Sequence, residues 1–329
     1  MIRMSVLTTA VLALAAQPLA ARDPLEAVVD TRDADRFAAL FIASDGQPTE
    51  EELEEEYLSA AGDGLALMRA TRFVTAAALS AAIAQKPAIY SDAIERCLPL
   101  IKGADRDLQA IYLALSGLFP GRSLPRVEVV IGAGTVAGIA SQGVQVIGLE
   151  TLCVGSRTDG ELREALRYFF AHETIHSFQP PLDASTLGAD PLLSLALHEG
   201  IADMVATIIL GRVPDTERHA WASARREVLM TRFHRDRQIL KDSASRGETL
   251  ATMSLEARDA LRRWHFNHGN VPEDWHSDLG YWIGRQIASA YVDQAADRRE
   301  AIYNLVRGME PIQVLEASGL SDVRSAGAM

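Results

Sequence analysis

Two histidines and the glutamate between them are the residues whose types and spacing point most directly to chemistry. His172, Glu173 and His176 form the pattern H-E-x-x-H. Residues four apart lie on one face of an α-helix, so both imidazoles can reach a single Zn²⁺ ion at about 2.0–2.1 Å. Glu173 lies beside that face, where its carboxylate can take a proton from a zinc-activated water. The pattern therefore predicts a zinc site in which Glu173 is the general base.

A third ligand is expected further along the chain, because catalytic zinc sites use three protein ligands and leave one position for water. Glu199 and Asp203 are four residues apart in the stretch HEGIAD, and so share one helical face. We expect Glu199 to bind the metal and Asp203 to accept the free ring N–H of a ligand histidine, with His172 as the first choice. His198 points about 100° away from Glu199 on such a helix, and we expect it to be a packing or surface residue.

Local signals place both groups of residues on helices. A capping-box pattern starts the first helix at Thr158, and two consecutive prolines end it near Gln179. Asp190, followed by a proline, is a favourable start for the second helix, and Gly211 is a favourable end. The connection over residues 180–190 is long enough for the two helices to pack antiparallel, so that the expected third ligand faces the histidines.

The two motifs together resemble those of the gluzincins, the thermolysin-like zinc peptidases. HETIH is followed by EGIAD, which supplies a Glu on a later helix and an Asp four residues on. More closely, the chain resembles a group of bacterial predicted Zn-dependent proteases related to gliding-motility lipoproteins. This wider resemblance includes YLSAAGDGL near Tyr57 and DLGYWIG near Tyr281. It implies a peptide or protein substrate and one zinc ion per chain.

The resemblance also implies roles for individual residues. The zinc ligands would be His172, His176 and Glu199. Glu173 would be the general base, and Asp203 would hold a ligand histidine. Gluzincins also have a Tyr or His that hydrogen-bonds to the developing charge, for which Tyr281 is our first choice and His276 our second. The alternative for Tyr281 is that it packs a helix. The remaining histidines have no partner motif and are expected to be structural or exposed: His219, His234, His265 and His268.

Composition is that of a globular protein. The 329 residues are 48% hydrophobic and 23% charged, which fits one or two closely packed domains. The net charge of −12 argues against a nucleic-acid partner and against binding to an anionic membrane surface.

The first 21 residues are typical of a secretory signal peptide. Arg3 precedes a short apolar core, and small residues at Ala20 and Ala21 suit cleavage before Arg22. An uncleaved N-terminal anchor is the alternative. We find no later stretch of membrane length, so we expect a periplasmic or secreted protein with no membrane span in the mature chain.

The chain is divided by its secondary-structure signals into three parts after residue 21. Helix signals dominate residues 22–121 and 213–329, and the zinc-binding core occupies residues 122–212. Strand signals at residues 127–131 and 144–147 precede the zinc helix. We therefore predict an α+β, predominantly helical fold with a small sheet packed on the zinc-binding helix pair. Residues 144–147 are the candidate edge strand for a substrate peptide, although an inner strand fits equally well.

Two features remain ambiguous. The stretch VVIGAGTVAG resembles the glycine-rich turn of a dinucleotide-binding site, and Glu150 could be the acidic residue that binds the ribose. Such a site also needs a helix between its two strands, for which only Thr135–Gln142 is available. We prefer two strands joined by a glycine-rich connection, and with it disfavour a nucleotide-dependent oxidoreductase. Cys97 and Cys153 either form one disulfide or remain two buried thiols.

The sequence thus favours an exported zinc metallopeptidase. A non-catalytic envelope protein that uses the same fold for binding is the alternative, and the presence of Glu173 favours the enzyme.

Overall fold

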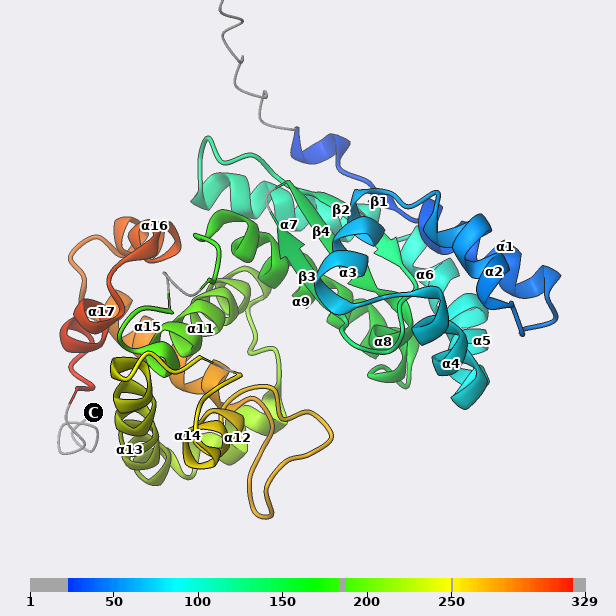
Figure 1. The fold of residues 1–329 in the computed structure, drawn as a ribbon. Coiled ribbons are helices and arrows are strands. Elements are labelled where there is room, and N and C mark those ends of the chain that lie inside the picture. Colours follow the sequence, from blue (N-terminus) through cyan, green and yellow to red (C-terminus); the bar gives the residue numbers. More distant parts are fainter. Residues whose placement is uncertain (1–22, 142, 184–186, 250, 322–329) are drawn as a thin grey trace, which may run out of the picture.

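The computed structural model describes residues 23–141, 143–183, 187–249 and 251–321. The predicted signal peptide, residues 1–21, lies outside the described residues. Within them the chain is mainly helical and carries a small four-stranded sheet, which confirms the predicted α+β class. In Figure 1 the sheet and α9 (Asp159–Phe178) lie between the N-terminal helices on the right and the C-terminal helices on the left.

The N-terminal region is a set of short helical segments packed around the sheet and α9. A buried Tyr57 ties this region to the sheet, because its hydroxyl donates to the Ile131 carbonyl at 2.7 Å and accepts the Ile131 N–H at 2.9 Å. Three of the helical segments, labelled η, are a 3₁₀ turn (η1) and two π turns (η2 and η3). The elements are η1 (Pro24–Glu26), α1 (Arg32–Ala43), α2 (Glu50–Glu52), η2 (Leu53–Leu58), α3 (Asp63–Arg72), α4 (Ala76–Gln85), α5 (Pro87–Asp92), η3 (Ala93–Cys97), α6 (Leu98–Lys102) and α7 (Asp105–Leu118).

Within the N-terminal region, α3 and α4 meet at a bend of 85°. Phe73 forms the bend in a left-handed conformation, with φ 54°. The bend places Met68 and Val74 against the same glycine, since a β-carbon on Gly132 would lie 3.1 Å from the first and 3.9 Å from the second. No proline or glycine lies at the break, but Thr75 gives α4 a local start signal, since its side chain accepts the Ala78 N–H at 3.2 Å.

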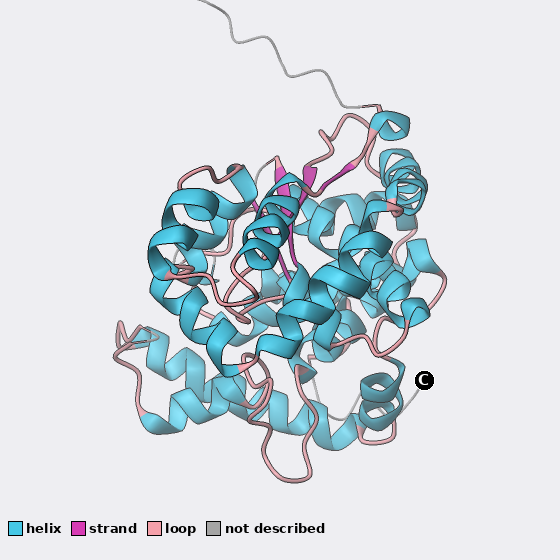
Figure 2. Cartoon of the chain, turned by 90° about the vertical axis from the view of Figure 1, so that its right-hand side faces the viewer, coloured by secondary structure: helices cyan, strands magenta, loops and turns pink. Residues whose placement is uncertain are grey.

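The sheet has the order β1-β2-β4-β3, with β1, β2 and β4 parallel and β3 antiparallel to β4. Figure 2 shows these short strands surrounded by helices. Two strands match the predicted ones, whereas β1 and β3 were not predicted. Of the two alternatives for residues 144–147, the inner strand is confirmed, because β4 lies between β2 and β3, and β3 is the edge strand on that side. The strands are β1 (Val29–Asp30), β2 (Arg126–Val130), β3 (Gly138–Ser141) and β4 (Val144–Gly148).

The connection from β2 to β4 contains β3 instead of the helix that a dinucleotide site needs. Glu150 is buried, and its carboxylate accepts the backbone N–H groups of Gly132 at 2.9 Å and Gly134 at 3.0 Å. Its role is therefore to hold the glycine-rich loop, which agrees with the preferred interpretation of two strands joined by a glycine-rich connection.

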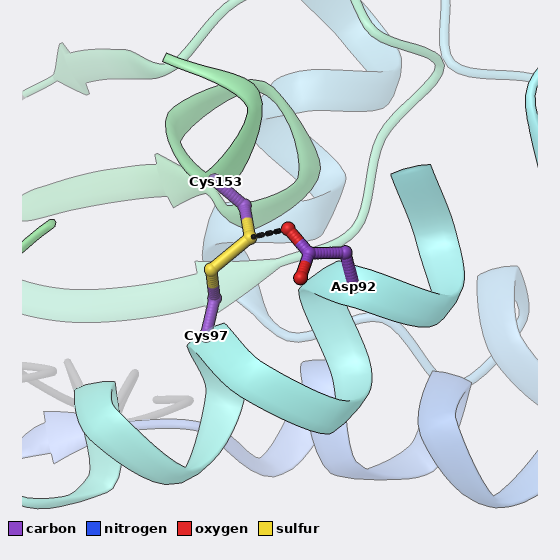
Figure 3. Close-up of side chains that lie close together, drawn as sticks. All are labelled: Asp92, Cys97 and Cys153. Carbon is purple, nitrogen blue, oxygen red and sulfur yellow. Dashed lines mark hydrogen bonds between the residues drawn. A yellow bond between two sulfur atoms is a disulfide. The ribbon is translucent and has the colours of Figure 1, made fainter. Parts of the chain in front are cut away.

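Cys97 and Cys153 form a disulfide between the end of η3 and α8 (Leu149–Val154), with Cα atoms 6.0 Å apart. Figure 3 shows the Asp92 carboxylate turned toward the Sγ of Cys153, 3.2 Å away. Because both sulfurs are bonded to each other, this group of side chains offers no thiolate for a metal. The bond joins the N-terminal helices to the element that follows the sheet.

The C-terminal half is helical from α9 onward, as predicted. By length and composition, α11 is apolar enough to cross a membrane, and 72% of that stretch is buried inside the protein. The prediction that no later stretch reaches membrane length therefore missed α11, whose apolar character is used in the core. These helices are α11 (Pro191–Leu210), α12 (Thr216–Ser223), α13 (Arg226–Ser245), α14 (Leu255–Arg262), α15 (Leu279–Gln294), α16 (Arg298–Gly308) and α17 (Pro311–Ala317).

Candidate metal centre

The α9 helix presents both motif histidines on one buried face. Its start is fixed by a reciprocal capping box between Thr158 and Glu161, and its last residue precedes Gln179, as predicted. The side chains of His172 and His176 lie one turn apart near the C-terminal end of this helix, and His172 is 2% exposed. The helix therefore places the two imidazoles side by side in the interior.

Glu199 on α11 completes a compact group of three ligand atoms. The Nε2 atoms of His172 and His176 are 2.9 Å apart, and the Oε2 atom of Glu199 lies 3.3 Å from the first and 3.2 Å from the second. Tetrahedral ligands at about 2.0–2.1 Å from zinc would be about 3.3–3.4 Å from one another. The donor set and the two distances to Glu199 fit one tetrahedral zinc ion with a fourth position for water, while the two nitrogens, at 2.9 Å, lie closer together than that geometry requires.

The outer nitrogen of His172 is held by two side chains. The Tyr168 hydroxyl donates to Asp203 Oδ1 at 2.7 Å and lies 2.9 Å from His172 Nδ1, and Asp203 Oδ1 lies 3.1 Å from the same nitrogen. Because the single hydroxyl proton of Tyr168 is used on Asp203, its oxygen can only accept from His172. The network therefore assigns a proton to Nδ1 and leaves the Nε2 lone pair for a metal. Asp203 lies against His172, where the sequence predicted it.

The outer nitrogen of His176 has a different partner. Gln179 Oε1 lies 2.7 Å from His176 Nδ1, while Gln179 Nε2 donates to the carbonyl of His198 at 2.9 Å. Because the amide oxygen can only accept, Nδ1 of His176 is a donor, and in the neutral imidazole the lone pair on Nε2 faces His172 and Glu199. The His198 ring stacks on His176 with ring centres 4.6 Å apart, so its role is packing against this imidazole.

Two Nε2 lone pairs at this separation repel each other unless a positive charge lies between them. Without a metal, burial lowers the pKa of His172 but hydrogen bonds to Asp203 and Glu199 outweigh it, raising the pKa to about 10. Burial raises the pKa of Glu199, but the adjacent His176 and His172 hold it well below its ordinary value. The site is therefore arranged to hold a cation, and a divalent ion can take the place of the proton.

Glu173 is buried beside the ligands and lies under the edge strand. A β-carbon on Gly138 of β3 would come within 2.7 Å of Glu173 Oε1 and 2.5 Å of the Phe169 ring, so only glycine allows the strand to approach this closely. Burial raises the pKa of Glu173 above its ordinary value, although both motif histidines act against this shift. A carboxylate whose pKa is raised toward neutrality is a better match for proton transfer.

A contact between two glycines brings α15 to the site. A β-carbon on Gly284 would lie 1.7 Å from the carbonyl oxygen of Ala196, and one on Gly200 would lie 2.2 Å from the carbonyl carbon of Gly284. The backbones of α11 and α15 therefore touch one residue after Glu199. Tyr281, about one turn before Gly284, is carried next to the ligands by this crossing.

The Tyr281 ring lies nearly parallel to His172, with an interplanar angle of 16° and ring centres 6.0 Å apart. His265, expected to be structural or exposed, is buried against Tyr281 and touches Gly280, where a β-carbon would lie 2.0 Å from its Nε2. His276 lies beside Trp221, and its Nδ1 contacts the Ser277 carbonyl. Of the two predicted candidates, Tyr281 is thus the one in contact with the ligand group.

Sequence reasoning missed three supporting side chains. Tyr168 is four residues before His172, so the same helical spacing that relates the ligands relates this pair. Gln179 is three residues after His176, which is also a helical neighbour. Arg218 donates to Asp203 Oδ2 at 3.1 Å from α12, and nothing in the motifs points to it.

No protein-family model, curated protein or solved structure matches this chain, so the resemblance to zinc peptidases rests on its own motifs and on the geometry of these residues.

Proposed function

We propose that the protein is an exported zinc metallopeptidase of the gluzincin type. The observation that carries the proposal is the convergence of three ligand atoms from His172, His176 and Glu199 within 2.9–3.3 Å of one another. Both histidines have their outer nitrogen tied to an acceptor, which is the arrangement of metal-binding imidazoles. The buried Glu173 beside them favours hydrolysis over binding alone.

The chain's own residues divide the reaction among them. Bound at these ligands, Zn²⁺ would lower the pKa of water and polarise a peptide carbonyl. Glu173 takes a proton from the attacking water and passes it to the leaving amine. Tyr281 donates its hydroxyl proton as a hydrogen bond to the carbonyl oxygen as negative charge develops there. Asp203 and Tyr168 keep His172 in the required tautomer.

The edge strand supports a peptide substrate. No other described strand pairs with the outer edge of β3, whose Gly138 lies directly against Glu173. An extended peptide can add to such an edge through main-chain hydrogen bonds, which brings its scissile bond toward the base. Substrate addition is thus assigned to β3, in place of residues 144–147.

The disulfide between Cys97 and Cys153 supports export, because such bonds persist in oxidising compartments. We therefore infer a periplasmic or secreted location and protein or peptide substrates found there.

The test compares two variants of the full chain for zinc content and peptide cleavage. Glu173→Gln keeps the ligands and should retain one zinc per chain while losing at least about a hundredfold in kcat. Glu199→Ala should lose both zinc and activity. Cleavage of peptides by Glu173→Gln at the wild-type rate would refute the assignment of the base, and a zinc-loaded wild type without hydrolysis of any library peptide would favour the binding protein.

A further inference from the structure

Arg218 is a buried side chain that touches several parts of the candidate site at once. It lies on α12, and 9% of it is exposed. Its Nη2 donates to Asp203 Oδ2 at 3.1 Å, and its Nη1 donates to the carbonyl oxygen of Asp278 at 3.3 Å. The guanidinium carbon lies 5.3 Å from the centre of the Tyr281 ring. One planar cation therefore joins a carboxylate, a helix start and an aromatic face.

These contacts reach residues with different proposed roles. Asp203 orients His172, and Tyr281 lies beside the ligands. Asp278 is the residue before α15, and its left-handed backbone, with φ 51°, turns the chain into the helix that carries Tyr281. Arg218 thus links the start of that helix to the carboxylate behind the metal site.

Other contacts hold the body of α15 without Arg218. Gly284 packs on Gly200, and Gly280 packs on the His265 ring. Removing the guanidinium therefore takes one hydrogen-bond donor from Asp203 Oδ2 and the cation from the face of the Tyr281 ring, but leaves the helix crossing intact.

We propose that Arg218 is a positioning residue for the proposed hydrolysis, directing Asp203 at His172 and setting the place of the Tyr281 hydroxyl. The inference rests on the proposed function. The substitution Arg218→Lys distinguishes the effect on Asp203 from the effect on Tyr281. A lysine ammonium is a point charge that can pair with Asp203, but it cannot reproduce the planar guanidinium that stacks on the Tyr281 ring.

The first experiment measures zinc affinity by competition with a chelator, which needs no activity. Arg218→Met should bind zinc about tenfold more weakly than wild type, the low end of the range found when a direct partner of a ligand histidine is lost, because Asp203 itself remains. Arg218→Lys should recover most of that affinity. Arg225→Met is the matched control, since Arg225 is exposed and stacks on Trp221 at 4.3 Å, away from the ligands.

Unchanged affinity in Arg218→Met would overturn the inference while leaving the proposed function standing. A wild-type protein that binds no zinc would overturn the proposed function, and this inference with it.

The second experiment is a double-mutant cycle at saturating zinc. Arg218→Lys should lower kcat at least about tenfold with KM within about twofold, because a small misplacement of a catalytic group is costly. In a Tyr281→Phe background the same substitution should have little further effect, since no hydroxyl remains to be positioned. If Arg218→Lys lowered kcat by the same factor in the wild-type and Tyr281→Phe backgrounds, Arg218 would not act through the Tyr281 hydroxyl, and the inference would be overturned.

Discussion

Gly200 of α11 and Gly284 of α15 are in backbone contact, and this contact places Tyr281 beside the residue pair His172 and Glu199. A β-carbon on Gly200 would lie 2.2 Å from the backbone of α15. Neither helix can shift without moving an element of the candidate site. Helix packing and site geometry therefore depend on the same glycine pair.

Gly200→Ala should consequently destabilise the protein and disturb the site. Because backbone atoms must move to admit the methyl group, we expect a loss of about 1–3 kcal/mol in the free energy of unfolding. Denaturant unfolding measures this. Gly117→Ala is the control: Gly117 is in α7, and a β-carbon on it would meet nothing within 4 Å, so the same change there should be neutral or stabilise by up to about 1 kcal/mol. Equal effects of the two substitutions would contradict the close crossing.

Tyr168→Phe tests the network behind His172. The substitution removes one hydroxyl that donates to Asp203 at 2.7 Å and lies 2.9 Å from His172 Nδ1. We expect zinc affinity to fall about tenfold or more, as for other partners of ligand histidines, with the fold preserved. Chelator competition measures the affinity. Tyr291→Phe, which removes a hydroxyl facing Met309, serves as the comparison and should bind zinc like wild type.

Zinc affinity should rise with pH. The pKa of His172 in the metal-free site is raised to about 10, by Asp203 and Glu199 acting against burial, so the imidazole is protonated at neutral pH. Zinc must displace that proton, and the apparent affinity should rise up to about tenfold per pH unit for each proton released. Competition titrations from pH 6 to 8 measure the slope, and a flat profile would contradict the assignment of His172 as a ligand.

The raised pKa of His172 has the opposite effect on the stability of the metal-free protein, which should decrease as pH rises. A folded-state pKa above the unfolded value of about 6.5 stabilises the protein at low pH, and that contribution is lost as pH rises toward 10. Thermal unfolding of chelator-treated protein should therefore show the His172 contribution decreasing over this window.

The sequence predicted the features that depend on neighbouring residues. The capping box at Thr158 and the spacing of His172 and His176 are local, and both are confirmed in α9. Asp190 was expected to cap α11, but its side chain makes no cap hydrogen bond and pairs instead with Arg237 at 2.5 Å. The ion pair with Arg237, which is distant in the sequence, therefore takes the place of the helix cap that Asp190 would otherwise form.

Features formed by distant pairing were missed. β1 has only two residues, and it exists because Val29 pairs with Val127. β3 begins at Gly138, a poor strand former, and is held by pairing with β4 over the Glu173 carboxylate. Arg218 reaches Asp203 because α12 packs on α15, which crosses α11. No spacing rule within one helix predicts such contacts, whereas Tyr168 could have been found at four residues before His172.

The central claim is that His172, His176 and Glu199 share one zinc ion. Anomalous diffraction at the zinc absorption edge, from crystals grown with zinc, tests it most directly. The account predicts one strong peak about 2.0–2.1 Å from the Nε2 atoms of both histidines and from a carboxylate oxygen of Glu199. A zinc peak at another place on the chain, or no peak among these three side chains, would contradict the claim.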